Sequence, residues 1–458
     1  MNDITAFFAF LKYCLGYKEN MSRVIAGMNW HELYSFASKQ ALLGLCFEGI
    51  ERLGEEYPEE LKRNPIGREL LMTWMGKAQQ IRRQNMKVNA VASKLFSMLR
   101  EDGMRCCILK GQGNALMYPN PYSRTPGDVD VWIDVSRERI MEYAQKKFEL
   151  EDDIRLQHLE TSLDGVPVEL HFFPCSMNNP IYHARLQKWF RRNADLQCSH
   201  IVGLPDGAGD IAIPTTAFNV IYQLTHLYHH FFDEGIGMRQ IIDYFLVVND
   251  FSKNVFLNND LSNHPVNFSN HPVPLSKEGS TFSPSPSSSG SGDVTAPSRC
   301  SEPLRSKDGG PSKVSPDCAG WDRLAIEGDN SAGSTTVVTS SASTALDVVQ
   351  KELKCLGLWK FAGAVMYVLH EALGLSEEKM IAPMDEKRGK LLLAEILNGG
   401  NFGKHFTKYG HFTQQGMAKK YFLKIWRNMH FVRYYPAEAL SEPIFRTWHF
   451  FWRLKHRR

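Results

Sequence analysis

Apolar side chains recur at helical spacing over the first hundred residues of the chain. The longest example covers residues 66–99, where apolar positions follow steps of three and four with no internal proline, which predicts one long amphipathic helix. Glu101, Asp102 and Gly103 form its expected end, because glycine commonly terminates helices. We therefore interpret residues 1–103 as an N-terminal helical region.

Between residues 104 and 210 the pattern changes to short apolar runs, several of which alternate with polar residues. Four runs predict strands, at residues 104–109, 128–133, 154–163 and 166–173. Residues 136–148 return to helical spacing, and Asp164-Gly165 between the last two runs predicts a two-residue hairpin turn. This order is typical of an α+β fold, with a small mixed sheet and helices on one side.

Helical spacing returns in residues 211–250. Segments 216–232 and 237–248 predict a pair of helices, which we expect to close a cleft over the sheet. The C-terminal region, residues 346–458, is also predicted to be helical, so we expect N- and C-terminal helices to wrap the small sheet. Its helical segments are predicted at residues 345–372, 389–397, 417–434 and 444–454.

Residues 251–345 differ from the helical regions on either side in composition. Positions 252–345 contain 21 serines and 9 prolines. A segment of this kind cannot bury enough apolar surface to offset the conformational entropy lost on folding. We therefore predict a disordered, Ser/Pro-rich insertion that separates the helical pair from the C-terminal helices.

The composition of the 458-residue chain is that of an ordinary globular protein, with 43% apolar and 22% charged residues. The formal net charge of +3 argues against a globally charged nucleic-acid coat protein. No apolar run is long enough to cross a bilayer, and the N-terminus lacks the basic start of a signal peptide. The nine cysteines are scattered without a C-x-x-C pair, which favours a reducing cytoplasm.

Positive charge is concentrated at the C-terminal end of the chain. Residues 403–458 contain 12 lysines and arginines but only two acids, Glu438 and Glu442. Aromatic residues, among them Trp426 and Trp448, are interleaved with the bases. This pattern is compatible with nucleic-acid binding, with peripheral contact at the inner membrane surface, or with a helical core that buries its aromatic residues.

Two acids on one predicted strand are the first candidates for chemistry. Asp128 and Asp130 lie two residues apart, so their side chains point to the same face and repel each other unless a cation lies between them. Mg²⁺ fits because it takes oxygen ligands from one or two carboxylates together with substrate phosphates. Glu169, flanked by valine and leucine on a later strand, would complete a two-metal site. An Asp-x-Asp pattern alone is also typical of a solvated strand end.

Candidate phosphate-binding residues surround these acids. Lys110, Gly111 and Gly113 follow the first strand and lead into a short helix predicted at 114–118. Glycines there let backbone N–H groups approach a phosphate, and a helix N-terminus favours negative charge. Arg124 lies in a loop rich in proline and glycine, four residues before the first aspartate, and is placed to meet a phosphate.

Together these residues resemble the polymerase-β-like nucleotidyltransferase superfamily, and within it the bacterial family of uncharacterised nucleotidyltransferases. The matching positions are Leu109-Lys110-Gly111, Tyr118-Pro119, Arg124, Asp128-x-Asp130, Val168-Glu169-Leu170-His171 and Arg239-x-x-x-Asp243. The resemblance covers residues 70–250 well and the C-terminal helices loosely.

The resemblance implies a nucleotidyltransferase core at residues 104–210. It implies transfer of a nucleoside monophosphate from an NTP to a hydroxyl of a small-molecule or glycan-linked acceptor. Asp128 and Asp130 would ligate Mg²⁺, with Mn²⁺ as an alternative, and Glu169 would be the third ligand or the base that acts on the acceptor hydroxyl. The residues expected to bind the nucleotide are Lys110, Gly111, Gly113, Arg124 and Arg239.

Members of the superfamily generally have a Gly-Ser pair in the turn after the first strand, whereas this chain has Lys110-Gly111-Gln112-Gly113. That difference supports a second hypothesis from another class of protein. The chain would then be a catalytically degenerate nucleotide-binding or scaffolding module, docking through its basic, aromatic C-terminus.

Two further groups on the predicted helical pair have more than one interpretation. His226, His229 and His230 share one helix face and fit either a zinc site or a packed or phosphate-facing cluster. Arg239 and Asp243 are four residues apart, which fits an intrahelical ion pair. Alternatively, Arg239 reaches the nucleotide from the helical side of the cleft.

Overall fold

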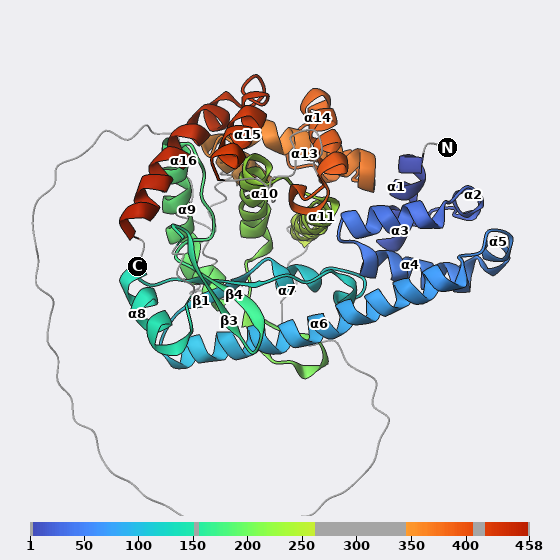
Figure 1. Cartoon of the computed structure of the whole chain (residues 1–458), viewed down its shortest axis with the longest axis horizontal. Coiled ribbons are helices and arrows are strands. Elements are labelled where there is room, and N and C mark those ends of the chain that lie inside the picture. The colour runs from blue at the N-terminus through green and yellow to red at the C-terminus, as the bar shows by residue number, and fades with distance from the viewer. Residues whose placement is uncertain (1–2, 151–154, 262–344, 406–416, 457–458) are drawn as a thin grey trace, which may run out of the picture. The chain divides into compact units, whose positions relative to one another are not determined.

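The computed structural model describes residues 3–150, 155–261, 345–405 and 417–456 (Figure 1). The sheet, the helices around it and the cavity described below belong to one compact unit, which joins residues before 258 to residues after 332. Positions 262–344 of the predicted insertion lie outside the described residues. The mixed α+β architecture predicted from the sequence is confirmed.

The described N-terminal region is helical. Its elements are α1 (Asp3–Cys14), α2 (Ser22–Ala26), α3 (Trp30–Lys39), α4 (Leu43–Glu56), α5 (Pro58–Arg63) and α6 (Arg68–Glu101). The long helix predicted at 66–99 is therefore confirmed as α6. It stops where Gly103 takes a φ of +73°, a conformation that glycine adopts without strain. Helix α6 contacts α4 as well as strands β1 and β4, so it joins the N-terminal helices to the sheet (Figure 1).

A four-stranded sheet forms the centre of the core, in the order β1-β2-β4-β3. Strand β1 (Cys106–Leu109) pairs antiparallel with β2 (Val129–Ile133). Strand β2 pairs parallel with β4 (Val166–His171), which pairs antiparallel with β3 (His158–Leu163). The sheet is therefore mixed, as predicted.

One face of this sheet is apolar and covered by helices. Val131, Val168 and Leu170 point to this face, because they alternate with the polar residues of their strands. They belong to a buried cluster with Leu95 of α6 and Ile140 of α8 (Arg137–Lys147). Burial of these aliphatic side chains holds the strands in register.

The opposite face is also partly covered, by α9 (Pro180–Ser199) and α10 (Thr216–Asp233). Trp132 of β2 points to this face, and its ring centre lies 6.1 Å from those of Phe190 and Phe218. The sheet therefore has helices on both faces, whereas the pattern within residues 104–210 alone had suggested helices on one side. Alternation shows that a strand has two unlike faces, but it does not show which distant helix covers the second one.

The β3–β4 hairpin has the predicted turn. Asp164 and Gly165 connect the two strands with φ values of +50° and +70°. A type I′ turn requires positive φ at both central residues, which Asp-Gly tolerates well. Leu163 consequently pairs with Val166, and this sets the register of the whole hairpin.

The remaining elements of the core are α7 (Gly111–Ala115), the 3₁₀ turns η1 (Pro121–Ser123) and η2 (Pro205–Gly207), β5 (Ile201–Gly203) and β6 (Asp210–Ala212). Helix α8 was predicted, and Ser136 caps it by accepting a hydrogen bond from the Arg139 N–H at 3.3 Å. Helix α7 begins earlier than the predicted 114–118. Helix α9 and the small β5–β6 sheet were not predicted.

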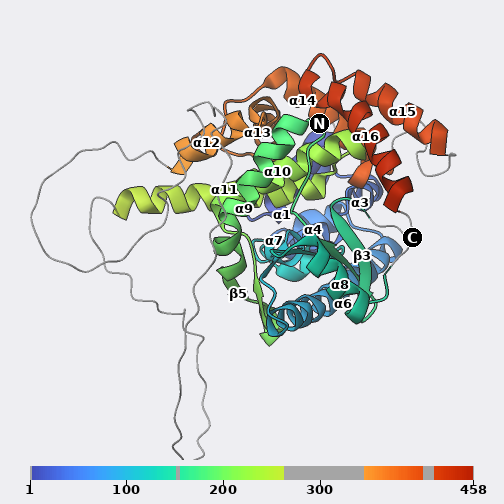
Figure 2. The same cartoon turned by 90° about the vertical axis from the view of Figure 1, so that its left-hand side faces the viewer.

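The later elements are α11 (Met238–Leu261), α12 (Ala345–Cys355), α13 (Trp359–Leu373), η4 (Glu377–Lys379), α14 (Glu386–Gly399), η5 (Asn401–Gly403), α15 (Met417–Met429) and α16 (Pro436–His456) (Figure 2). Helix α11 continues past the predicted end at 248, so residues 251–261 are helical. The predicted helix at 345–372 is broken at Gly357, which has a φ of +72°. None of the described helices is long and apolar enough to span a bilayer.

The hairpin turn can be tested by Gly165→Ala. A Cβ disfavours the left-handed conformation, so we expect the free energy of unfolding to fall by about 1–2 kcal/mol. Gly54→Ala is the control, because Gly54 lies in α4 with open space around its Cβ position, and should be neutral or stabilising by up to about 1 kcal/mol. Urea unfolding measures the change in the free energy of unfolding for both variants. Equal effects of the two substitutions would show that the turn conformation is unimportant.

Candidate active site

A polar cavity of about 360 Å³ lies between the uncovered part of the sheet and the helices α10 and α11. Seven of the eight residues proposed from the sequence line it: Lys110, Gly111, Arg124, Asp128, Asp130, Glu169 and Arg239. Gly113 is not among the lining residues. A Cβ at Gly113 would lie 3.0 Å from Ile213, so this glycine permits close packing against that residue.

Three carboxylates form one end of the cavity, from β2, from the residue just before it and from β4. Asp130 in β2 pairs directly with Glu169 in the parallel strand β4. Asp128 lies two residues before Asp130 and shares its face. One oxygen from each acid lies within 4.8 Å of the others. The structure therefore brings together the three acids that the sequence indicated as metal ligands, with Asp130 only 4% exposed.

Repulsion between these acids affects the ionisation of Asp128. The nearby charge of Asp130, followed by desolvation and then by the charge of Glu169, raises the pKa of Asp128 to about 6. A divalent cation between the oxygens would relieve this repulsion. Because carboxylate oxygens are the ligands that Mg²⁺ takes, the three residues fit a magnesium site.

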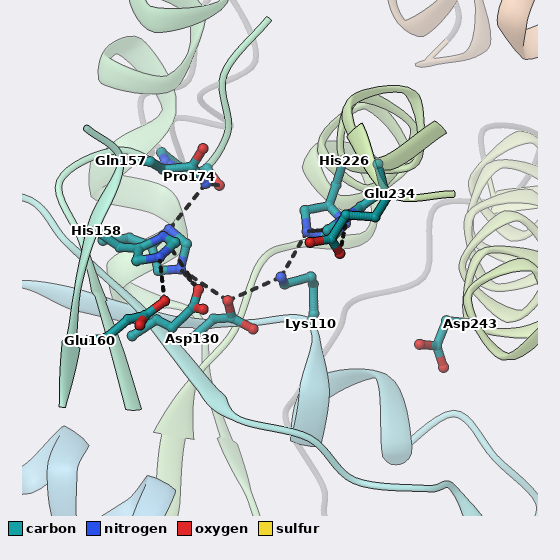
Figure 3. Close-up of polar contacts among 12 residues, drawn as sticks. Lys110, Asp130, Gln157, His158, Glu160, Pro174, His226, Glu234 and Asp243 are labelled. Atoms are coloured by element: carbon teal, nitrogen blue, oxygen red, sulfur yellow. Dashed lines mark hydrogen bonds and ion pairs between the residues drawn. The ribbon is translucent and has the colours of Figure 1, made fainter. Parts of the chain in front are cut away.

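Lys110 reaches the carboxylates from the turn after β1. Its backbone has a φ of +51° and a ψ of −127°, a conformation that costs a residue other than glycine about 1–3 kcal/mol. Its Nζ lies 3.0 Å from Oδ1 of Asp130 and 2.9 Å from Nε2 of His226 in α10 (Figure 3). Burial alone would lower the pKa of Lys110, but the three carboxylates raise it. The turn therefore holds a charged ammonium group inside the cavity.

His171, the last residue of β4, bridges two of the acids. Its Nε2 lies 3.0 Å from Oδ1 of Asp130 and 3.1 Å from Oε2 of Glu169. Burial would lower the pKa of His171, but its hydrogen bonds to these carboxylates raise it to about 9. The contact also lowers the pKa of Glu169 to about 2, against the effect of burial. Glu169 is therefore ionised at neutral pH and is a weak base.

His158 of β3 adds a neutral imidazole next to this cluster. Burial, together with the charge of His171, lowers the pKa of His158 to about 2. Neither ring nitrogen of His158 makes a hydrogen bond within the described residues, although Nδ1 lies 3.4 Å from Oε2 of Glu169 and Nε2 lies 3.6 Å from Oε1 of Glu160. His158, Glu169 and His171 each offer a ligand atom within 4.8 Å of the others. His158 and His171 therefore form, together with Glu169, a second group of possible metal ligands, and Glu169 belongs to both groups.

Arg124 is held by Asp243 of α11. Its guanidinium donates two parallel hydrogen bonds to the Asp243 carboxylate, each 2.8 Å long, and Tyr118 donates a third. Both residues of the pair are at most 5% exposed. The intrahelical pair between Arg239 and Asp243 is not formed, because the loop arginine takes this carboxylate. Spacing along one helix cannot reveal a partner from another segment.

Arg239 is less constrained than Arg124. One of its terminal nitrogens donates to the Thr125 carbonyl at 3.1 Å, while its Nε has no hydrogen-bond partner among the described residues. Its guanidinium lies 5.6 Å from the ring centre of Phe402. Burial and the neighbouring Arg124 lower the pKa of Arg239. Of the two arginines, Arg239 has more hydrogen-bonding capacity left for an anion in the cavity.

Histidines of α10 line the wall opposite the sheet. Nε2 of His226 lies 3.0 Å from Nε2 of His230, in addition to its contact with Lys110. Burial lowers the pKa of His226, His229 and His230, so all three favour the neutral form. They are not among the metal-ligand groups found in the described part of the chain. The arrangement favours the packed cluster over the zinc site.

Two groups of residues that line the cavity were not predicted from the sequence. Asn114 and Gln223 exchange hydrogen bonds of 3.0 and 2.6 Å that join α7 to α10, and nothing in the local pattern indicates this pairing. Phe402 and Lys404 follow α14, far from the strands in sequence. Phe402 has a φ of +53°, and the glycines around it are the signal that could have indicated an irregular segment there.

Acids on neighbouring strands, with a cation from the turn after the first strand, define a site suited to phosphoryl transfer. A sequence profile of the family described as uncharacterised nucleotidyltransferase matches residues 26–262. The chain therefore belongs to this nucleotidyltransferase family. The matched region includes every candidate residue proposed from the sequence.

No curated protein sequence matches the chain. Among solved structures, the crystal structure of an antigenic nucleotidyltransferase-like protein from Paracoccidioides brasiliensis aligns with 39% of this chain and 88% of that chain, at 18% identity and a TM-score of 0.26. A TM-score this low carries no information about what this chain does.

Asp128→Asn should leave the Tm at pH 8 unchanged or higher, because it removes a charge that Asp130 repels. The pKa of Asp128 is about 6 in the folded protein and about 3.9 in the unfolded protein. The folded wild type is therefore progressively destabilised as the pH rises from about 4 to 6 and Asp128 ionises beside Asp130. The advantage of the variant should be largest above pH 6 and disappear near pH 4. Thermal unfolding in metal-free buffer measures the difference in Tm between the variant and the wild type. A variant that is less stable than the wild type at pH 8 would show that Asp130 does not destabilise the ionised Asp128.

Asp243→Asn should lower the free energy of unfolding by about 3–5 kcal/mol, because it leaves the buried guanidinium of Arg124 without a counter-charge. The control is Glu59→Gln, which breaks an exposed ion pair with Lys62 and should cost less than about 1 kcal/mol. Urea unfolding compares the two. Similar small losses of unfolding free energy in the two variants would show that the charge of Asp243 does not stabilise the buried Arg124.

Proposed function

We propose that the chain is a Mg²⁺-dependent nucleotidyltransferase, with Mn²⁺ as an alternative metal, that moves a nucleoside monophosphate from an NTP to an acceptor hydroxyl. The hydroxyl belongs to a small molecule or a glycan-linked acceptor. The observation that carries this proposal is the meeting of Asp128, Asp130 and Glu169 within 4.8 Å beside the partly buried Lys110.

The three carboxylates would hold the metal. Bound there, Mg²⁺ would orient the triphosphate and neutralise charge that develops during transfer. The low pKa of Glu169 favours the ligand role over the role of base, because an acid with a pKa of about 2 accepts a proton weakly at neutral pH. Of the two roles considered for Glu169, we therefore propose metal ligand.

The cations of the cavity would bind and align the triphosphate. In the transfer, the acceptor oxygen bonds to the α-phosphorus while the bond from that phosphorus to the pyrophosphate oxygen breaks. Pyrophosphate leaves, and the hydroxyl proton passes to solvent water. Lys110 and Arg239 have side-chain N–H groups in the cavity and would contact phosphate oxygens. Arg124, bound to Asp243, would act by positioning the loop before β2. Gly111 lines the cavity and leaves its backbone accessible to phosphate.

One observation favours a second candidate, a nucleotide-binding or scaffolding module without catalysis. Lys110 and His171 both contact Oδ1 of Asp130, so two cations already compensate the central carboxylate. In an enzyme, bound metal must compete with these contacts. In a degenerate module, they would replace the metal permanently.

For either candidate we propose a cytoplasmic location. The cysteines at positions 14, 46, 106, 107, 175, 198 and 355 are all free, which fits a reducing compartment.

Asp130→Asn tests the catalytic proposal. Purified protein is incubated with each labelled NTP and with Mg²⁺ or Mn²⁺, and mass spectrometry detects products that carry an added nucleoside monophosphate, including the protein itself. We expect metal-dependent transfer by the wild type and a loss of at least about 100-fold in the variant, since electrostatic groups of this kind contribute about that much.

Asp134→Asn is the matched control, because Asp134 follows the same strand but pairs with Arg105 and does not line the cavity. Its activity should equal that of the wild type. Wild-type binding of NTP without transfer to any acceptor, and without dependence on metal, would instead support the degenerate module.

A further inference from the structure

The C-terminal helices α15 and α16 carry an exposed apolar surface. Within the described residues, all exposed tryptophan and phenylalanine side chains lie in these two helices: Trp426, Trp448, Phe450 and Phe451. Met429, Leu440 and Ile444 of the same helices are also exposed. The interpretation that this segment buries its aromatic residues in a core is therefore wrong for these four side chains.

Four of the exposed residues form one stripe along α16. Leu440, Ile444, Trp448 and Phe451 follow each other at steps of four, four and three, so they share one helical face. They are 52%, 73%, 50% and 63% exposed, respectively. A stripe of this length is unusual on the surface of a monomeric protein and marks a site of interaction.

The two acids of this segment point inward. Glu438 accepts hydrogen bonds from two backbone N–H groups before α9, and Glu442 pairs with Arg446. Both acids are 1% exposed. Residues 423–452 consequently present no exposed carboxylate.

Three of the four bases in residues 423–452 are engaged as well, because Lys424 and Arg446 pair with Asp233 and Arg427 pairs with Glu395, while Arg433 is exposed. Four further bases follow in the sequence, Arg453, Lys455, Arg457 and Arg458. The segment that carries the stripe therefore has a positive net charge in its sequence, which favours a negatively charged partner.

We propose that the stripe of Leu440, Ile444, Trp448 and Phe451 is a docking face for an anionic lipid bilayer. The helix would lie in the plane of the membrane, with the stripe at the boundary between headgroups and acyl chains. Tryptophan is well suited to this boundary, because its ring is apolar and its N–H can remain hydrated. The basic residues would attract the anionic headgroups.

The chemistry of the stripe distinguishes a membrane from other partners. Nucleic acid would use the bases and the aromatic rings, but it offers nothing to bury Leu440 and Ile444. A second copy of the chain would match apolar stripe to apolar stripe, yet it would also bring two strongly basic segments together. An anionic bilayer would bury the aliphatic side chains and would also attract the positive charge.

The buried side of α16 contacts the wall of the cavity. Arg446 lies 2.9 Å from Asp233, which is one of the lining residues. Lys424 of α15 lies 2.8 Å from the same carboxylate. Docking would therefore place the cavity close to the lipid surface. The docking itself does not depend on nucleotide transfer and can be tested separately from it.

The experiment is co-sedimentation of the full chain with vesicles of phosphatidylcholine, with and without phosphatidylglycerol, in the absence of nucleotide and metal. The variant combines Ile444→Ser, Trp448→Ser and Phe451→Ser. The control combines Leu71→Ser, Met72→Ser and Met75→Ser, which removes three exposed apolar side chains from α6. Circular dichroism and the Tm establish that both remain folded.

We expect the wild type and the α6 control to sediment with anionic vesicles, and the α16 variant to bind at least about tenfold more weakly, since three interfacial side chains are lost. Raising salt from about 0.1 to 1 M should weaken wild-type binding, because the Debye length falls from about 10 to 3 Å.

Three results would overturn the proposal. The first is equal vesicle binding by the α16 variant and the wild type, and the second is no binding of the wild type to anionic vesicles. The third is a stripe-dependent interaction of another kind: a concentration-dependent dimer in sedimentation velocity, or binding to a labelled oligonucleotide, that the α16 variant loses while vesicle binding is unchanged.

Discussion

The site depends on the parallel register of β2 and β4, which places Asp130 directly opposite Glu169. Adjacent strands in a sheet are about 4.8 Å apart, so two ionised side chains on the same face at paired positions repel strongly. The aliphatic residues that alternate with them are buried on the other face and prevent the register from slipping. Apolar burial on one side of the sheet thus stabilises an arrangement that is electrostatically unfavourable on the other.

Cations from separate parts of the chain compensate this cluster. Lys110 comes from a strained turn after β1, and His171 from the end of β4, and both contact the carboxylate of Asp130. A second buried pair, Arg124 with Asp243, ties the loop before β2 to α11. Two contacts therefore connect the sheet side of the cavity to the helices: the ion pair of Arg124 with Asp243 of α11, and the contact of Lys110 with His226 of α10. This explains why the helical pair and the sheet form one site.

Features of the fold that depend only on neighbouring residues in the sequence were predictable. The Asp164-Gly165 turn and helix α6 follow from conformational preference and from periodicity. The predicted helix at 345–372 was not continuous, because Gly357 takes a left-handed conformation next to the ring of Tyr182. That contact joins α12 to α9, which lie far apart in sequence. The contacts of Trp132 with Phe190 and Phe218 were not predicted for the same reason.

The sequence by itself determined which acids share a face, because a strand alternates its side chains and aspartates two residues apart must point the same way. It also indicated the family through the spacing of these acids, the lysine–glycine turn and the later glutamate. Only the tertiary structure decided the partners of the charges: Asp243 binds Arg124 rather than Arg239, and Lys110 and His171 share Asp130. Electrostatic partners are chosen by distance in space, and distances between remote segments arise only when the apolar faces have packed.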